Sequence, residues 1–143
     1  MTLIHGTCVT LDGAAVLLRG PSGSGKSDLA LRLLDDGARL ISDDQTFVKM
    51  QEGRLVATAP KTIAGKMEVR GVGILSVESK NSGILELVVD LAVDSPKRMP
   101  DPETTEILGI ALPLLRLNPF EASAAAKLRL ALRSMAGKER RKA

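Results

Sequence analysis

One stretch of this chain restricts its fold more than any other. It fits the pattern G-x-x-x-x-G-K-[ST] of a phosphate-binding loop and consists of Gly20, Pro21, Ser22, Gly23, Ser24, Gly25, Lys26 and Ser27. In such a loop, backbone N–H groups hold phosphate oxygens, and glycines let the chain approach them closely and turn tightly. A strand must precede the loop and a helix must follow it, because the helix N-terminus adds unpaired N–H groups and the positive end of its dipole.

The sequence indicates both flanking elements. Residues 14–19 are a short apolar run of strand length. Residues 28–36 carry apolar side chains at helical spacing, and Gly37 follows where a helix C-cap glycine belongs. A chance glycine-rich turn would not need this context. We therefore predict that the loop binds ATP, with the Lys26 ammonium on the β- and γ-phosphates and the Ser27 hydroxyl as a ligand of Mg²⁺.

Turn signals and alternation predict a mixed sheet in the rest of the chain. Asp12-Gly13 is a hairpin signal between strands at 7–11 and 14–18, so the strand that feeds the loop has an antiparallel neighbour. Further strands are expected at 38–42, 46–51, 54–58, 84–93 and 107–115, and loops at 60–66, 81–83 and 95–105. A second helix is expected from Asn118, as its N-cap, to about residue 136. These elements form a β-rich α/β domain with two principal helices.

Length and charge indicate one domain with a short tail. The chain has 143 residues, which corresponds to a single domain. We assign residues 1–137 to one folded domain that carries the phosphate-binding loop, and residues 138–143 to a tail that holds four basic residues and one acidic one. Without the tail the chain has no net charge, so the overall charge of +3 does not indicate a basic face. With two Phe and neither Trp nor Tyr, the chain also lacks platforms for stacked bases, and we expect no nucleic-acid partner.

Cysteine content and hydropathy indicate the compartment. The single cysteine, Cys8, excludes an internal disulfide framework and suits a reducing environment. Cys8 could be a nucleophile, although a small residue within a strand is the simpler interpretation. No stretch approaches the length of a membrane span, and the N-terminus lacks a charged region followed by an apolar run. We therefore expect a cytoplasmic protein without a membrane partner.

Two adjacent carboxylates follow the strand that is predicted after the first helix. Asp43 and Asp44 lie 17 and 18 residues after Lys26. Adjacent carboxylates at a strand end can divide the work of a kinase, one near the metal and one near the proton of the acceptor hydroxyl. The alternative is a structural turn or a helix cap, where Asp is common. Asp90 competes as the metal carboxylate, because it follows an apolar run that resembles a Walker B strand.

Other polar residues could contribute to the same chemistry. His5, the only histidine, precedes the hairpin that leads into the loop and could tune a carboxylate or shuttle its proton, although a lone N-terminal histidine is usually just exposed. Strand alternation puts Glu68 and Arg70 on one face, where a solvated ion pair is the simpler interpretation. Lys97 and Arg98 lie in a proline-rich segment and could clamp a transferring phosphoryl group, or be solvated loop charges.

Together these residues resemble one family, the bacterial HPr kinase/phosphorylases, which act on a serine of HPr, the carrier protein of the sugar phosphotransferase system. The matching segments are residues 5–6, 20–27, 37–44 and 67–74. The last of them, Met-Glu-Val-Arg-Gly-Val-Gly-Ile, looks like the family signature. The resemblance spans about residues 4–135. It implies a phosphate-loop fold of the phosphoenolpyruvate-carboxykinase-like type, which is an α/β fold with a mixed sheet and flanking helices. Proteins of this family usually assemble as a homo-oligomer, a hexamer.

The resemblance implies roles for the candidate residues around the nucleotide. Lys26 would hold the phosphates of ATP, and Ser27 and Glu68 would sit around Mg²⁺. Asp44, with Asp43 beside it, would take the proton from the acceptor serine.

Two more residues gain a role in the same way. His5 would support Asp44, and Arg98 matches the catalytic arginine of the loop after the long strand. The implied function is Mg-ATP-dependent phosphorylation of a serine of HPr. A small-molecule kinase on the same scaffold and a non-catalytic nucleotide-sensing module remain open as alternatives.

The sequence departs from the family pattern in three places. The N-terminal domain of the longer members is not expected, since the chain begins just before His5. The segment at 76–83 is shorter and lacks the family's usual aromatic-glycine ending. Residues 113–118 stand where the family has an arginine- and glycine-containing stretch tied to dephosphorylation. The resemblance therefore supports the kinase reaction for this chain more directly than it supports the phosphorylase reaction or a hexameric assembly.

Overall fold

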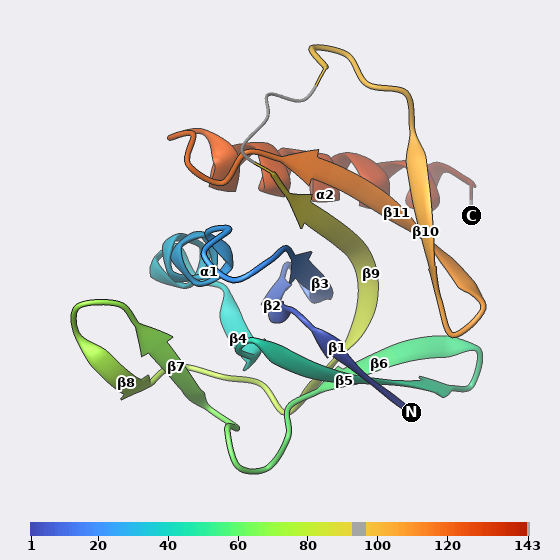
Figure 1. Ribbon diagram of the computed structural model, residues 1–143. Coiled ribbons are helices and arrows are strands. Elements are labelled where there is room, and N and C mark those ends of the chain that lie inside the picture. The colour runs from blue at the N-terminus through green and yellow to red at the C-terminus, as the bar shows by residue number, and fades with distance from the viewer. Residues whose placement is uncertain (93–96, 143) are drawn as a thin grey trace.

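The computed structural model describes the backbone of residues 1–92 and 97–142 and, of these, the side chains up to Met135. Two helices accompany a strongly curved sheet and a separate hairpin (Figure 1). The elements are β1 (Thr2–His5), β2 (Thr7–Leu11), β3 (Ala14–Arg19), α1 (Lys26–Asp35), β4 (Arg39–Ser42), β5 (Gln45–Gln51), β6 (Arg54–Thr58), β7 (Lys66–Val69), β8 (Gly73–Ser76), β9 (Ser82–Leu91), β10 (Glu103–Ile107), β11 (Ile110–Leu117) and α2 (Ala124–Lys142).

The sheet is mixed, as the Asp12-Gly13 hairpin predicted. Its strand order is β1-β5-β6-β9-β3-β2-β4, and β11 with its partner β10 joins at β9. The long strand β9 pairs antiparallel with β6 near its start and parallel with both β3 and β11 further on. Because the parallel strands β3, β9 and β11 end at the same edge, the loop after β3 emerges beside the end of β9, whose other parallel partner is β11.

Side chains of the central strands alternate between two buried clusters. On β3, Val16 and Leu18 join a cluster that also holds Leu33 of α1 and Leu128 of α2. Leu17 points to the opposite face and joins the second cluster, to which β5, β6, β10 and β11 contribute. Both helices therefore pack on one face of the sheet. This packing holds the N-terminus of α1 close to the C-terminal end of β3, and residues 20–25 connect the two.

Several strands differ from the sequence-based expectation, which included no strand at β1 and placed Lys66, the first residue of β7, in a loop. The strand expected at 107–115 is two strands, β10 and β11, which meet at a tight turn where Leu108 and Gly109 both have positive φ, of 49° and 81°. A leucine in the left-handed region gives no turn signal in the sequence. The expected loop at 95–105 accordingly ends where β10 begins at Glu103, and its residues 95–96 lie outside the described part. The expected turn at 81–83 is wrong for Ser82 and Gly83, which open β9, and Val93 of the expected strand is outside the described residues.

The second helix begins at Ala124 and not at Asn118, and its backbone extends to Lys142. The Asn118 side chain does accept a hydrogen bond from the Phe120 N–H, at 3.0 Å, but in an isolated turn. The cause lies in α1, because the Arg32 guanidinium donates to the carbonyls of Pro119 and Glu121. The Pro119 carbonyl is thereby bound to α1, whereas the Glu121 carbonyl also accepts the Ala124 N–H, at 3.1 Å, where the helix begins.

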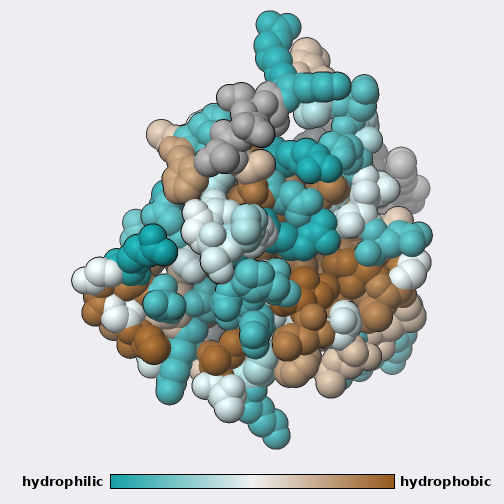
Figure 2. All heavy atoms as spheres, in the orientation of Figure 1, coloured by the Kyte–Doolittle hydropathy of each residue, from teal (hydrophilic) through white to brown (hydrophobic). Residues whose placement is uncertain are grey.

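Apolar side chains gather at two places on the face shown in Figure 2. One lies on the right, where Figure 1 has β6, β9 and β10. The other lies at the lower left over the β7–β8 hairpin, whose Val72 and Ile74 are both exposed. Within the part of the chain that the structure describes, neither helix has an apolar stretch long enough to cross a lipid bilayer.

Candidate active site

The predicted phosphate-binding loop connects β3 to α1, as its pattern requires. Its last glycine, Gly25, is the N-cap of α1 with φ of 96°, so the helix begins without a capping side chain. A Cβ atom on Gly25 would lie 2.9 Å from Pro119 Cγ, and one on Gly20 would lie 2.5 Å from Ser24 Oγ. Close approach of other groups therefore explains why glycine occupies both positions. The uncapped N–H groups at the start of α1 are available for an anion.

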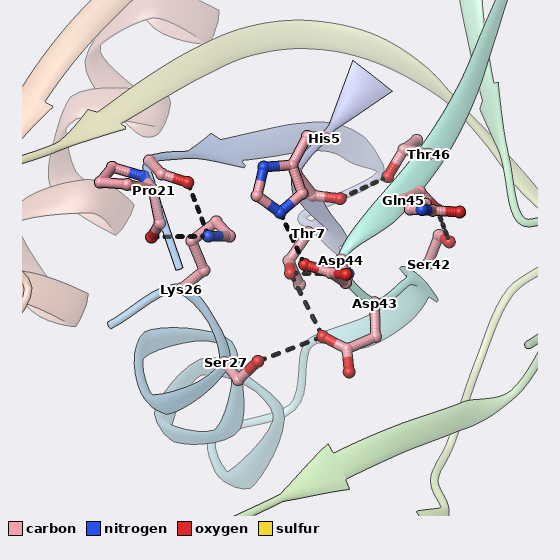
Figure 3. A network of polar contacts seen from close by, with 12 residues as sticks. His5, Thr7, Pro21, Lys26, Ser27, Ser42, Asp43, Asp44, Gln45 and Thr46 are labelled. Carbon is pink, nitrogen blue, oxygen red and sulfur yellow. Dashed lines mark hydrogen bonds and ion pairs between the residues drawn. The ribbon is translucent and has the colours of Figure 1, made fainter. Parts of the chain in front are cut away.

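Lys26 is buried and folds back across this loop. Its Nζ donates to the carbonyl oxygens of Gly20, at 2.6 Å, and Pro21, at 3.0 Å (Figure 3). Both acceptors are neutral carbonyls, so the positive charge of Lys26 has no carboxylate partner among the described residues. An ammonium held in this way is well placed to exchange carbonyl contacts for phosphate oxygens.

The buried Asp43 follows β4, and its carboxylate accepts hydrogen bonds from three other elements. Its Oδ1 accepts hydrogen bonds from Thr7 Oγ1 on β2 and from Ser27 Oγ on α1, both at 3.2 Å. Its Oδ2 accepts the backbone N–H of Glu68 on β7, at 3.1 Å. Figure 3 shows the carboxylate between Ser27 and Thr7. Three donors thus fix the Asp43 carboxylate beside the serine that ends the loop.

Asp44 points the other way and is the more accessible of the two carboxylates. Its Oδ1 lies 2.8 Å from His5 Nε2, and the two side chains are 61% and 50% exposed (Figure 3). The backbone of Asp44 has φ of 66°, and its N–H and carbonyl are bound by Thr7 Oγ1 and the Gly6 N–H, at 3.0 and 2.8 Å. Antiparallel pairing of β1 with β5, in which His5 lies opposite Gln45, brings the histidine to the aspartate.

A cleft of about 580 Å³ joins these parts, a size typical of small-molecule sites. Its walls combine the phosphate-binding loop, the start of α1, both aspartates, β7 and the turn before α2. The lining residues include Ser22, Gly23, Gly25, Lys26, Ser27, Asp43, Asp44, Glu68, Arg70 and Phe120. Glu68 and Arg70 are both exposed in this wall, although Arg70 lies just beyond the end of β7 and not within the strand, as had been expected.

Several candidates do not line this cleft, among them His5, which reaches it only through Asp44. Arg98 is exposed and does not line the cleft, and residues 93–96, which lead to it, lie outside the described residues. Asp90 forms a two-pronged ion pair with Arg19, with Nε–Oδ1 and Nη2–Oδ2 distances of 2.8 and 3.1 Å. The Asp90 carboxylate is thereby committed to a neighbouring strand, and Asp43 is the strand-end carboxylate that reaches Ser27.

Three residues with a part in the site were missed by the sequence analysis. Thr7 binds both aspartates, Arg32 holds the turn before α2, and Phe120 lines the cleft. Each acts across a large sequence separation. Neither alternation nor a local motif marks such contacts.

Cys8 is not a nucleophile of this site. It is completely buried in β2, and burial raises the pKa of its thiol to about 12, although a backbone hydrogen bond with Val16 partly opposes the shift. At pH 8 only about one molecule in ten thousand would carry the reactive thiolate. We expect iodoacetamide at pH 8 to leave Cys8 unmodified in the native protein and to alkylate it in urea, as mass spectrometry would show. Rapid alkylation of the native protein would contradict this burial.

The residues around Ser27 fit a magnesium ion. Among the described residues, no cluster of three or more His, Cys, Asp or Glu side chains could form a protein-only metal site. Magnesium, however, usually binds through one or two carboxylates together with water and substrate phosphates. The Ser27 hydroxyl, the Asp43 carboxylate next to it and the Glu68 side chain in the same wall supply such a set.

Comparison with known proteins identifies relatives of this chain. The family model described as HPr Serine kinase C-terminal domain matches residues 1–118. An HPr kinase/phosphorylase of Brevibacillus brevis is 36% identical over 127 residues, covering 80% of this chain and 41% of that protein. One of Chlorobium phaeobacteroides is 34% identical over 126 residues, covering 79% and 37%. This chain therefore spans less than half the length of these relatives.

The fold has a counterpart among solved structures. The Hpr(Ser) kinase/phosphatase of Coxiella burnetii superposes with a TM-score of 0.85 at 24% sequence identity. The match covers 98% of this chain and 99% of that one. The predicted α/β fold with a mixed sheet and flanking helices is thus confirmed.

Proposed function

Since this chain belongs to the family of HPr serine kinase C-terminal domains, we propose that it uses Mg-ATP to phosphorylate a serine hydroxyl of HPr or an HPr-like carrier. One observation carries the proposal: Asp44, bonded to His5, lies in the wall of the same cleft as the phosphate-binding loop. A nucleotide-sensing module would need the loop but not an accessible carboxylate beside it.

In the proposed mechanism, the loop and Lys26 position the triphosphate. Backbone N–H groups at the start of α1 would hold phosphate oxygens, and the Lys26 ammonium would leave the carbonyls of Gly20 and Pro21 for the β- and γ-phosphates. Ser27 and Glu68 would hold the magnesium ion, with Asp43 orienting the Ser27 hydroxyl through its hydrogen bond, and the ion would neutralise negative charge on the phosphates. Positioning and charge neutralisation supply most of the acceleration in phosphoryl transfer.

Asp44 is the proposed base for the acceptor serine. Its carboxylate is open to the cleft, whereas both oxygens of Asp43 already accept hydrogen bonds. The serine O–H would donate to Asp44 while its oxygen attacks the γ-phosphorus, and Asp44 would receive the proton. His5 would keep the carboxylate oriented through the hydrogen bond to Oδ1.

The proposed partners are proteins. The β7–β8 hairpin, which contributes Glu68 to the cleft, exposes Val72 and Ile74 at its far end. Such an apolar surface beside the cleft suits a protein acceptor better than a metabolite. We also propose a homo-oligomer, a cytoplasmic location, and a catalytic role for Arg98 as family expectations that await their own tests.

A phosphotransfer assay tests the function. The protein would be incubated with Mg²⁺ and γ-labelled ATP, with HPr in one set of reactions and a panel of hydroxyl-bearing metabolites in another. We expect label on a serine of HPr. Label in a metabolite would favour a small-molecule kinase, and ATP binding without any transfer would favour a sensing module. Transfer of the phosphoryl group from seryl-phosphorylated HPr to added inorganic phosphate, with formation of pyrophosphate and unmodified HPr, would show the phosphorylase reaction as well.

The contact between His5 and Asp44 makes a separate prediction. Replacing His5 by Ala should lower kcat about tenfold, because Asp44 loses the hydrogen bond that orients it, and should leave the KM for ATP unchanged. Steady-state kinetics with HPr measure both constants. Leu3→Ala, in the same strand and also exposed, is the control and should keep the normal kcat. An unchanged kcat in His5→Ala would remove His5 from the mechanism.

A further inference from the structure

The turn before α2 places an aromatic ring at the cleft. Phe120 is 58% exposed, lines the cleft and lies against the phosphate-binding loop, where its Cε1 is 3.4 Å from the position of a Cβ on Gly25. The chain has only one other aromatic residue, Phe47 in β5, which does not line the cleft. More than half of this apolar ring is exposed, so its burial in the protein alone contributes little to stability.

Hydrogen bonds hold the backbone of the turn on both sides of Phe120. The Arg32 guanidinium donates to the carbonyls of Pro119 and Glu121, the residues before and after Phe120. The Asn118 side chain accepts the Phe120 N–H, at 3.0 Å. Arg32 is in turn paired with Asp28 at 3.0 Å. Figure 1 shows the turn, in orange, next to α1. The backbone around Phe120 is therefore fixed relative to the start of α1.

The position of Phe120 relative to the aspartates follows from helix geometry. Successive residues of an α-helix are about 100° apart, so Arg32 lies about 140° around the axis of α1 from Ser27. Ser27 contacts Asp43, and Arg32 contacts the turn that carries Phe120. The start of α1 thus has the carboxylates on one flank and the aromatic ring on the other. Leu31, 38% exposed, lines the cleft between them on the same helix.

From this arrangement we infer that Phe120, with Leu31, forms the site for the base of a nucleoside triphosphate. The inference rests on the proposed function, in which the γ-phosphate points toward Asp44 and Ser27. A triphosphate bound in this direction along the loop presents its nucleoside to the opposite flank of α1. There the exposed ring offers a flat apolar surface, and aromatic rings stack on bases with little regard to their identity. Phe120 and Leu31 would therefore strengthen the binding of nucleotides without selecting strongly among them.

The test compares a ligand that has a base with one that lacks it. Isothermal titration would measure the Kd of Mg-ATP and of magnesium tripolyphosphate for the wild type and for Phe120→Ala. We expect the substitution to raise the Kd of ATP about five- to fiftyfold and to leave the Kd of tripolyphosphate unchanged. Phe120→Trp should restore ATP binding. Leu130→Ala on the exposed face of α2 is the control for loss of an exposed apolar side chain and should bind both ligands normally.

The outcomes separate this inference from the proposed function. Equal weakening of both ligands would mean that Phe120 only shapes the loop, and no weakening of ATP would mean that the base lies elsewhere; either result overturns the inference. Failure of the wild type to bind either ligand would overturn the nucleotide-dependent function and the base site together. Because Phe120 is exposed, Phe120→Ala should melt at the wild-type temperature, which excludes unfolding as the cause.

Discussion

Replacing Lys26 by alanine should reduce phosphotransfer to HPr about a thousandfold or more. The ammonium is the one charged group that the structure holds on the phosphate-binding loop itself, through the carbonyls of Gly20 and Pro21. Loss of a preorganised charge from the developing transition state costs rate on this scale. Initial rates with γ-labelled ATP and HPr measure the effect. The variant should still fold, because the two carbonyls can bind water that enters in place of the side chain.

The control for this result is Lys49→Ala, which removes an exposed lysine of β5 that does not line the cleft. It should transfer phosphate at the normal rate. Thermal melting of both variants would show that neither has lost its fold. A Lys26→Ala protein that phosphorylates HPr normally would mean that the loop does not hold the transferred phosphate.

Replacing Asp44 by asparagine should remove the reaction and spare nucleotide binding. Asparagine keeps the shape and an oxygen that can accept from His5, but it cannot take a proton from the serine. We expect kcat to fall by about 10²- to 10⁴-fold while the Kd of Mg-ATP stays within about twofold. Initial rates and isothermal titration give the two numbers.

Asp43→Asn is the matched comparison for this substitution. Asp43 contacts Ser27 and the backbone of Glu68, so its loss should weaken Mg-ATP binding as well as the rate. The two adjacent residues should thus give different phenotypes. Normal activity in Asp44→Asn would make the base assignment wrong, and loss of ATP binding in Asp44→Asn but not in Asp43→Asn would reverse the two roles.

The elements that the sequence predicted well are those with local signals. The glycine pattern at 20–27 requires a strand and a helix around it, and Asp12-Gly13 fixes the neighbouring hairpin, so the centre of the fold follows from short-range chemistry. The predictions for residues 107–115 and for the start of α2 were wrong because the sequence there carries no local signal of the observed structure. Leu108 adopts a left-handed conformation, and Arg32 of α1 binds the carbonyls of Pro119 and Glu121 in the turn that precedes the helix.

Local sequence patterns predicted the parts of the site, but only the resemblance to the family assigned different roles to the two aspartates. The sequence predicted that Asp43 and Asp44 follow the end of a strand. Which of them is buried on Ser27 and which is open to His5 depends on the register of β1 against β5 and on Thr7, which bonds to both aspartates. These contacts join segments 36 to 39 residues apart. Sequence periodicity does not encode such pairings.

The central claim is that the cleft holds a triphosphate on the loop while Asp44 faces its terminal phosphate. A crystal structure with magnesium and a non-hydrolysable ATP analogue measures this directly. We predict that Lys26 Nζ leaves the carbonyls of Gly20 and Pro21 for the β- and γ-phosphate oxygens, with the Asp44 carboxylate open toward the γ-phosphate. A triphosphate bound outside the loop, or one in the loop with both aspartates turned away from it, would contradict the account.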